Sequence, residues 1–260
     1  MKEKNFSFLN GISDDDRVML SRLIDWTYMA EEKYVSKFSF FMDERQCGLC
    51  EQILASIGFK NYMLWGGYDN ASRRIVGIFP PYSDADKNDF PIVPITFEYR
   101  KEDKLSHRDF LGALMNLGIS RECVGDILVS EGRSAAFLKN SIAEDVLQNI
   151  RKIGRTGVKV YEGYDESIVP KVNIQEISGT VASLRIDCIL SLVLRISREK
   201  AAALIKNTGV DINYLTHDSP DFCIGDGDKF SVRGYGKFIL ISVNGTTKKD
   251  RLHITVGKYI

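Results

Sequence analysis

Apolar and polar positions alternate in short, closely spaced stretches along the whole chain. Residues 14–33 carry apolar side chains at helical spacing, and the three aspartates that open this stretch suit a helix N-terminus. The pattern predicts a small α/β domain that ends at Pro80 and Pro81, where regular structure stops. Its other expected elements are a strand at 37–42, a helix from about 44 to 57, and strands at 62–65 and 74–79 around a loop at 66–70.

The stretch after the two prolines shows six further elements in the order β-α-β-β-α-β. This order predicts a sandwich like that of ferredoxins and RNA-recognition motifs. The paired aromatic residues with which those motifs stack bases are missing, so we do not expect bases to stack on this sheet. The expected elements are strand 92–100, helix 108–117, strands 126–130 and 135–139, helix 142–153 and strand 157–161.

Two short amphipathic helices and a strand are expected between residues 183 and 213. The first helix has a single apolar stripe, with Arg185 and Arg195 at its two ends. Ser197 can cap the second helix, and Gly209 closes it. The stripe of the first helix consists of Ile186, Ile189, Leu190, Val193 and Leu194.

The second helix carries basic residues opposite its apolar side. Arg198 and Lys206 fall on one face with Ala202 between them, within roughly 80° of the helix surface. The small alanine lets a backbone approach the two cations. The arrangement therefore predicts a surface that binds the phosphate groups of a nucleic acid.

The charge distribution supports a nucleic-acid partner for the C-terminal part. Lys plus Arg and Asp plus Glu number 35 each, so the formal net charge is zero. Residues 178–260 nevertheless hold 12 Lys and Arg against 8 Asp and Glu, which leaves 23 against 27 for residues 1–177. A local group of cations releases counterions from RNA whatever the total charge of the protein.

The ordered motifs of this region resemble the S4 RNA-binding domain. Arg185-Ile186-Asp187 matches the signature of its first helix, Ser197-Arg198-Glu199-Lys200-Ala201 the start of its second, and Leu204-Ile205-Lys206 the end of that helix. Gly209 and the strand Val210-Asp211-Ile212-Asn213 follow, with one residue more than usual before the glycine. The resemblance implies an S4 fold and contact with structured RNA.

The resemblance extends over nearly the whole chain to the YlmH-type S4 proteins of bacteria. The stretches 107–119, 125–129 and 152–160 are similar to the central domain of that family, and 65–68, 233–238 and 246–251 also fit. Membership implies binding to the large ribosomal subunit, a link to the rescue of stalled nascent chains, and loci beside cell-division genes. The implied partners are ribosomal RNA and tRNA.

We therefore expect an α+β protein of three domains. They are an N-terminal α/β domain at 1–81, a central ferredoxin- or RRM-like domain at 82–170 and, after an extended connector at 171–182, an S4 domain with C-terminal strands at 183–260. Shape and phosphate contacts would govern RNA binding. The expected contacts are Arg185, Arg198 and Lys206, then Arg195, Ser197, Lys200, Arg233 and Lys237, and more weakly Arg108, Arg155 and Lys159 in the central domain.

An enzyme is not expected. The motifs of tyrosyl-tRNA synthetases, pseudouridine synthases and methyltransferases are missing, although an RNA-modifying enzyme with an unrecognised site stays an alternative. Cys47 and Cys50 have metal-like spacing without a second pair, and Gly225-Asp226-Gly227-Asp228 suits a β-turn better than a calcium loop. No cofactor or metal is expected. A second alternative is an adaptor that recruits a division protein through the acidic N-terminal half.

Composition places the protein in the cytosol. The chain has 260 residues, of which 44% are hydrophobic and 27% charged, as in ordinary globular domains. No apolar run approaches the roughly 18 residues that span a bilayer, and the five cysteines are odd in number, as expected for reduced thiols. We expect a cytoplasmic monomer without membrane contact.

Overall fold

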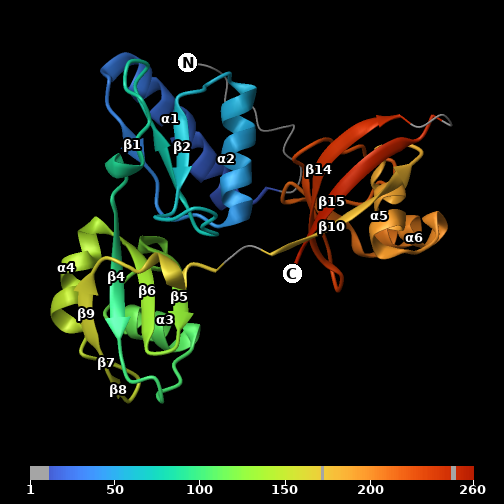
Figure 1. The fold of residues 1–260 in the computed structure, drawn as a ribbon. Coiled ribbons are helices and arrows are strands. Elements are labelled where there is room, and N and C mark those ends of the chain that lie inside the picture. The colour runs from blue at the N-terminus through green and yellow to red at the C-terminus, as the bar shows by residue number, and fades with distance from the viewer. Residues whose placement is uncertain (1–11, 171–172, 247–249) are drawn as a thin grey trace. The chain divides into compact units, whose positions relative to one another are not determined.

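The structure is a computed structural model that describes residues 12–170, 173–246 and 250–260 (Figure 1). Helices and antiparallel sheets are mixed along the chain. The described residues form two compact units, one from Ile12 to Pro170 and one from residue 173 to Ile260.

The first unit begins with two capped helices, α1 (Asp14–Lys33) and α2 (Glu44–Ser56). The Ser13 hydroxyl accepts a hydrogen bond from the Asp16 backbone N–H at 3.1 Å, and the Asp16 carboxylate accepts one from the Ser13 N–H at 2.9 Å. Asp43 and Gln46 form the same reciprocal cap on α2. Of the three aspartates expected at the first helix start, Asp16 therefore belongs to a capping box, in which two otherwise unpaired backbone donors are satisfied.

The same part of the chain contains a small antiparallel sheet. Its strands lie in the order β1 (Lys37–Phe38), β3 (Ile75–Ile78), β2 (Tyr62–Trp65). The prediction of one strand over 37–42 was too long. The Ser39 N–H still donates to the Val76 carbonyl of β3, but the chain then turns away, since the Phe41 N–H donates to the Glu122 carbonyl. Further along, an isolated bridge joins Met42 to Arg74.

The central elements follow the predicted β-α-β-β-α-β order. They are β4 (Ile92–Glu98), α3 (His107–Asn116), β5 (Val124–Ser130), β6 (Arg133–Lys139), α4 (Asn140–Asn149) and β9 (Lys159–Glu162). The strands form one antiparallel sheet in the order β5-β6-β4-β9. Short 3₁₀ turns lie at Lys87–Asp89, Arg121–Cys123 and Glu166–Ile168.

The second central helix ends earlier than predicted, at Asn149 and not at residue 153. Ile150 has an extended backbone, and the chain then makes a two-residue hairpin of β7 (Lys152–Ile153) and β8 (Thr156–Gly157). Gly154 turns this hairpin with a φ of 58°, which glycine adopts without steric cost. The apolar pattern of 150–153 therefore comes from a hairpin that packs on the core, because Ile150 and Ile153 are both buried.

Both faces of the central sheet are covered. One face packs on the helices, where Phe97, Leu138 and Ile95 join Phe110 of α3 and Val146 of α4 in one core. On the other face Leu128 and Phe137 share a core with residues of the N-terminal domain, namely Phe41, Tyr68, Ala71, Ile75 and Phe79. The two domains expected at 1–81 and 82–170 are thus parts of a single packed unit.

Hydrogen bonds around Asp126 of β5 reinforce this shared core. Its carboxylate accepts from the Tyr68 hydroxyl at 2.7 Å and from the backbone N–H groups of Ser72 and Arg73 at 2.6 and 3.1 Å. The Arg73 guanidinium donates to the carbonyls of Val124 and Phe41 at 3.0 and 2.9 Å. The loop before β3 is therefore tied to β5 by both charge and backbone contacts.

The second unit is a six-stranded antiparallel sheet with two helices. The helices are α5 (Ile186–Leu194) and α6 (Arg198–Thr208). The strand order is β10-β15-β14-β13-β11-β12. The strands are β10 (Ile174–Val181), β11 (Val210–Ile212), β12 (Leu215–His217), β13 (Lys229–Val232), β14 (Gly236–Thr246) and β15 (Leu252–Tyr259).

The stretch 171–182, predicted as a connector, is largely a strand of this sheet; residues 171 and 172 lie outside the described part. β10 pairs with β15 from Ile174 opposite Tyr259 to Val181 opposite Leu252. The strand partner lies more than 70 residues further along the chain, so no local pattern could show that the extended segment is paired.

The predicted apolar stripe of the first C-terminal helix packs on the sheet. Ile186, Ile189, Leu190 and Val193 are buried in one core with strand residues such as Phe230, Phe238, Leu240 and Val256, and Leu194 packs against its edge. From α6, Ala201 and Ile205 enter the same core. The packing leaves the charged ends of both helices at the surface.

Candidate RNA-binding surface

A buried carboxylate joins the two helices of the second unit. Asp187, in the first turn of α5, exposes only 3% of its side chain. It accepts hydrogen bonds from Nε and Nη2 of Arg185 at 3.2 and 3.0 Å, and from Nε of Arg198 at 3.0 Å. Because Arg198 begins α6, this cluster fixes the start of one helix against the start of the other.

The electrostatics of the cluster favour its fully charged state. Burial would raise the pKa of Asp187, but the hydrogen bonds from Arg185 and Arg198 outweigh it, so that its pKa lies below the ordinary value. The hydrogen bond to Asp187 in turn raises the pKa of Arg185. Two cations share one anion, so the three groups together carry a net positive charge, and Arg198 exposes 53% of its side chain.

Two of the three cations ranked first for phosphate contact therefore already have a partner. Arg185 and Arg198 are held in place by Asp187, and parts of both guanidinium groups still face solvent. A guanidinium has five N–H donors, so donors are left over for a phosphate. We infer that Asp187 pre-orders the two arginines, a role that the sequence motif alone did not reveal.

The other helix-side candidates lie at the ends of the two helices and in the first turn of α6. Arg195 ends α5 in the left-handed conformation, with a φ of 54°, and Lys206 lies exposed in the last turn of α6. Ser197 caps α6 as predicted, because its hydroxyl accepts from the Lys200 N–H at 3.2 Å. That hydroxyl keeps its own proton to donate, while the Lys200 side chain is exposed.

The two remaining candidates of this unit lie elsewhere. Arg233 is exposed in the turn between β13 and β14. Phe238 points into the core beside the helices, so the preceding Lys237 lies on the opposite face of the sheet. There its ammonium lies 5.4 Å from the ring centre of Tyr214 and 5.6 Å from that of Tyr259. The eight predicted contacts therefore do not form one continuous patch.

The acidic turn before β13 is structural. The Asp228 carboxylate accepts from the Gly225 N–H at 2.6 Å and from the Asn213 side-chain amide at 2.7 Å. The backbone N–H of Asp228 closes the turn on the Gly225 carbonyl at 3.1 Å. The expected β-turn is thus confirmed, with the carboxylate engaged in holding it.

The central candidates are also separated by the fold. Arg108, near the start of α3, lines a groove of about 590 Å³ together with Arg151 and Lys152. Arg155 is exposed in the β7–β8 hairpin. Lys159 lies on β9 next to Val160, which packs on the helix side, so Lys159 belongs to the other face of the sheet.

A comparison with known proteins relates these features to a family. The family model described as "Putative RNA-binding domain in YlmH" matches residues 85–166, which hold the central elements from β4 to β9. The ribosome-associated protein quality control protein P2 of Bacillus subtilis is 30% identical over 247 residues, covering 93% of this chain and 94% of that protein. The chain belongs to the YlmH family.

A solved structure of the YlmH family is also similar. The cell division protein ylmH from Streptococcus pneumoniae is 26% identical, with a TM-score of 0.49; the match covers 60% of this chain and 94% of that one.

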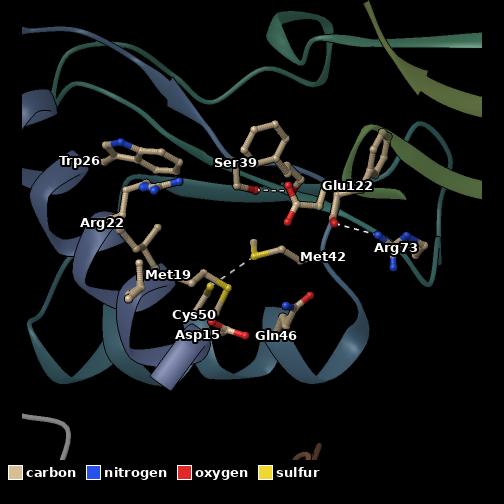
Figure 2. Close-up of a pocket in the computed structure, with 14 residues that line it drawn as sticks. Asp15, Met19, Arg22, Trp26, Ser39, Met42, Gln46, Cys50, Arg73 and Glu122 are labelled. Atoms are coloured by element: carbon tan, nitrogen blue, oxygen red, sulfur yellow. Dashed lines mark hydrogen bonds between the residues drawn. The ribbon is translucent and has the colours of Figure 1, made fainter. Parts of the chain in front are cut away.

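The N-terminal part of this YlmH-family chain has a cavity of about 600 Å³ (Figure 2). Arg22 and Trp26 of α1 lie on one side of it, and Met42 and Cys50 lie below, with the two sulfur atoms 3.9 Å apart. Val18 and Phe40, both exposed, line it as well. Its walls mix apolar groups with polar and charged ones, which are Asp15, Arg22, Ser39, Gln46, Arg73 and Glu122.

The paired cysteines of α2 are part of the core. Cys47 and Cys50 are fully buried, and burial raises the pKa of the Cys47 thiol to about 11 and that of Cys50 further. Both thiols are therefore protonated near neutral pH, whereas a metal ligand must be a thiolate. Within the described ranges no group of three or more His, Cys, Asp or Glu side chains is placed to hold a metal, and no helix there could cross a membrane.

Two sets of residues in this YlmH-family chain were missed at the level of sequence. Asp187 was recognised only as part of the Arg185-Ile186-Asp187 motif. Its position, two residues after Arg185 and eleven before Arg198, could have indicated an ion pair, because the two arginines begin adjoining helices. Arg151 and Lys152 were placed inside a predicted helix, and so their position at the mouth of a groove beside Arg108 could not be foreseen.

Proposed function

We propose that this protein is a ribosome-associated RNA-binding protein that acts in the quality control of stalled translation. Its relative in Bacillus subtilis bears a name of that meaning, and the family model over its central domain is described by RNA binding. The observation that carries the proposal is the Asp187 cluster, in which a buried carboxylate holds two arginines at the surface between two helix starts.

The second unit would be an S4 domain that supplies the main RNA contacts. Its elements α5, α6 and β11 follow the order of the S4 motifs, and the motif residues Arg185, Asp187 and Arg198 interact directly. A rigid pair of guanidinium groups suits phosphate, because the planar fork binds oxygen pairs with little loss of side-chain freedom. The contacts would therefore position structured RNA through its backbone.

The RNA would be ribosomal RNA of the large subunit, with tRNA as a second ligand. Binding would leave the RNA chemically unchanged, and the protein would act as a monomer. A role without catalysis is supported by the state of the reactive groups. The thiols of Cys47 and Cys50 are buried, and the carboxylates of Asp187, Asp126 and Asp228 all accept structural hydrogen bonds. Incubation with ribosomal RNA followed by mass spectrometry should reveal no protein-dependent methyl group or pseudouridine.

Sedimentation of a cell lysate at low magnesium tests the ribosomal role. The protein should travel with the separated large subunits, and the bound fraction should rise when stalled nascent chains accumulate. A variant with Arg195, Lys200 and Lys206 changed to glutamate should stay in the light fractions, while Lys33, Lys60 and Lys101 changed likewise should not alter the distribution. All six side chains are exposed, so folding should survive in both variants.

The opposite result would favour an adaptor in cell division. Recovery of the unaltered protein in the light fractions alone, together with division proteins after nuclease treatment, would contradict the ribosomal proposal. The N-terminal cavity between α1 and α2, with Val18 and Phe40 exposed beside it, is then the surface to mutate.

A further inference from the structure

The central sheet has no free face for RNA at its middle strands. Phe137 of β6 is fully buried, with its ring centre 4.9 Å from that of Tyr68 and 5.0 Å from that of Tyr164. Thr96 of β4 exposes 1% of its surface and donates to the Gly163 carbonyl at 2.6 Å. RNA-recognition motifs stack bases on these two strands. If the central domain binds RNA, another surface must do so.

The helix side offers such a surface in the groove beside α3. Arg108 on α3 faces Arg151 and Lys152, which follow α4, across a space of about 590 Å³. That volume falls within the roughly 300–1,000 Å³ typical of ligand sites. Asn116 and Asn149 add side-chain amides to the same walls. The groove therefore presents donors from two separate segments of the chain, α3 and residues 149–152.

The charges in the groove favour an anion. Its one acidic lining residue is Asp109, whose carboxylate accepts from the Ser106 N–H and hydroxyl at 2.8 and 2.7 Å. Those hydrogen bonds lower the pKa of Asp109 and hold the carboxylate at the helix cap. Arg151 donates to the carbonyls of Leu147 and Ile150 at 2.9 and 3.0 Å, which fixes its guanidinium while other N–H groups remain.

The floor of the groove is open to a sugar-phosphate chain. Gly112 and Ala113 of α3 line it, and a Cβ atom added at Gly112 would meet nothing within 4 Å. A glycine inside a helix costs about 1 kcal/mol relative to alanine, and no packing contact of this helix requires it here. The missing side chain leaves room for a ligand backbone to approach α3.

The geometry points to this groove as the second RNA site of the protein, where Arg108, Arg151 and Lys152 bind the phosphates of one strand. The inference rests on the proposed RNA-binding function and assigns the part of it that belongs to the central domain. Bases would face away from the protein, since the groove is lined by cationic and amide side chains and no aromatic side chain lines it. Affinity at this site should therefore depend on salt and little on sequence.

The test measures binding of the full chain to protein-free RNA from large ribosomal subunits, over a range of salt concentrations. The Arg108→Ala and Lys152→Ala double variant should bind about 10-fold more weakly near 0.1 M salt and flatten the log–log salt slope by about 1 to 2 units. Arg151 is left in place because it also binds the end of α4. The matched control is Lys33→Ala with Lys60→Ala, which removes equal charge elsewhere in the same unit.

A second variant blocks the groove without removing charge. Gly112→Gln places its Cβ where no atom lies within 4 Å and should stabilise α3, yet it should weaken RNA binding several-fold. If both groove variants bound RNA like the unaltered protein while the Arg195, Lys200 and Lys206 variant lost binding, the groove would not be an RNA site, and the proposed RNA-binding function would still hold. Equal loss in the Lys33 and Lys60 control would also overturn it, in favour of diffuse charge. Failure of the unaltered protein to bind RNA would instead contradict the proposed function.

Discussion

Arg198, the first residue of α6, donates a hydrogen bond from Nε to Oδ2 of Asp187 on α5 at 3.0 Å. The same oxygen accepts from Nη2 of Arg185 at 3.0 Å. Removal of one arginine leaves the carboxylate with a partner, whereas removal of both leaves a buried charge unpaired. Stability and RNA binding are therefore coupled through Asp187, and mutations of this surface must be designed to separate them.

The first prediction uses this coupling. Arg185→Ala and Arg198→Ala should each lower the free energy of unfolding only slightly, but the double variant by roughly 3–5 kcal/mol, because an unpaired buried charge remains. Adding Asp187→Asn to the double variant should recover part of the stability and none of the RNA binding. Urea unfolding and filter binding measure the two effects. Additive losses in the double variant would mean that Asp187 does not hold the arginines jointly.

Two of the three cations ranked first for phosphate contact are therefore also structural. From sequence, Arg185 lies at the end of an apolar stripe and Arg198 on the polar side of its helix, so neither was expected to contact a buried group. Folding brings the starts of α5 and α6 together around a buried acid, which makes both side chains part of the structure. Lys206, at the far end of α6, keeps the exposed position that was predicted.

The second prediction separates electrostatic binding from structure. Arg195, Lys200 and Lys206 are exposed, so changing all three to alanine should alter stability by less than about 0.5 kcal/mol each. If each neutralises one phosphate, the salt slope for large-subunit RNA should flatten by about 2 to 3 units. The control variant, Lys33, Lys60 and Lys101 to alanine, should keep the slope. An equal change in both would indicate diffuse attraction only.

Local patterns predicted the helices and the central topology well. The α1 bounds, the Ser197 cap and the stripe of α5 depend on neighbouring residues, whose spacing directly sets helical faces and caps. The 150–153 segment was misassigned because an apolar run of that length suits a helix end or a hairpin equally. Gly154 was the residue that could have decided it.

Long-range relations could not be predicted. The pairing of β10 with β15 and the burial of Phe137 under Tyr68 join segments about 70 or more residues apart in sequence. Phe137 and Leu128 lie on the sheet face that an isolated RRM-like domain would expose, and nothing in their own stretch says what covers them. The coverage matters for function because it closes the sheet to bases.

The third prediction tests that coverage. Asp126→Ala removes the acceptor for Tyr68, Ser72 and Arg73, and should cost about 3 kcal/mol of unfolding free energy because hydrogen bonds to a charged group are lost. Hydrogen exchange should speed up in β5 and in residues 66–73. RNA binding by the folded variant should be unchanged. Tighter RNA binding would instead show that opening the sheet exposes a competent face.

The last prediction concerns acid. Asp16 exposes 4% of its side chain and receives two hydrogen bonds from Arg45, at 3.0 and 2.6 Å. The Arg45 hydrogen bonds lower the pKa of Asp16 from 3.8 to about 2. Because the pKa is lower in the folded chain, the pair stabilises it above about pH 4, and this stability is lost as the pH falls towards 2.

The loss should amount to about 2.5 kcal/mol, at about 1.4 kcal/mol per pKa unit. Asp16→Asn should therefore unfold more easily than the unaltered protein at pH 6, and the difference between them should shrink between pH 4 and pH 2. Asp15→Asn removes an exposed carboxylate from the same helix turn and controls for the helix dipole. Denaturant unfolding at several pH values gives the curves. If the curves of Asp16→Asn and the unaltered protein ran parallel down to pH 2, the Arg45 pair would not be the source of the acid sensitivity.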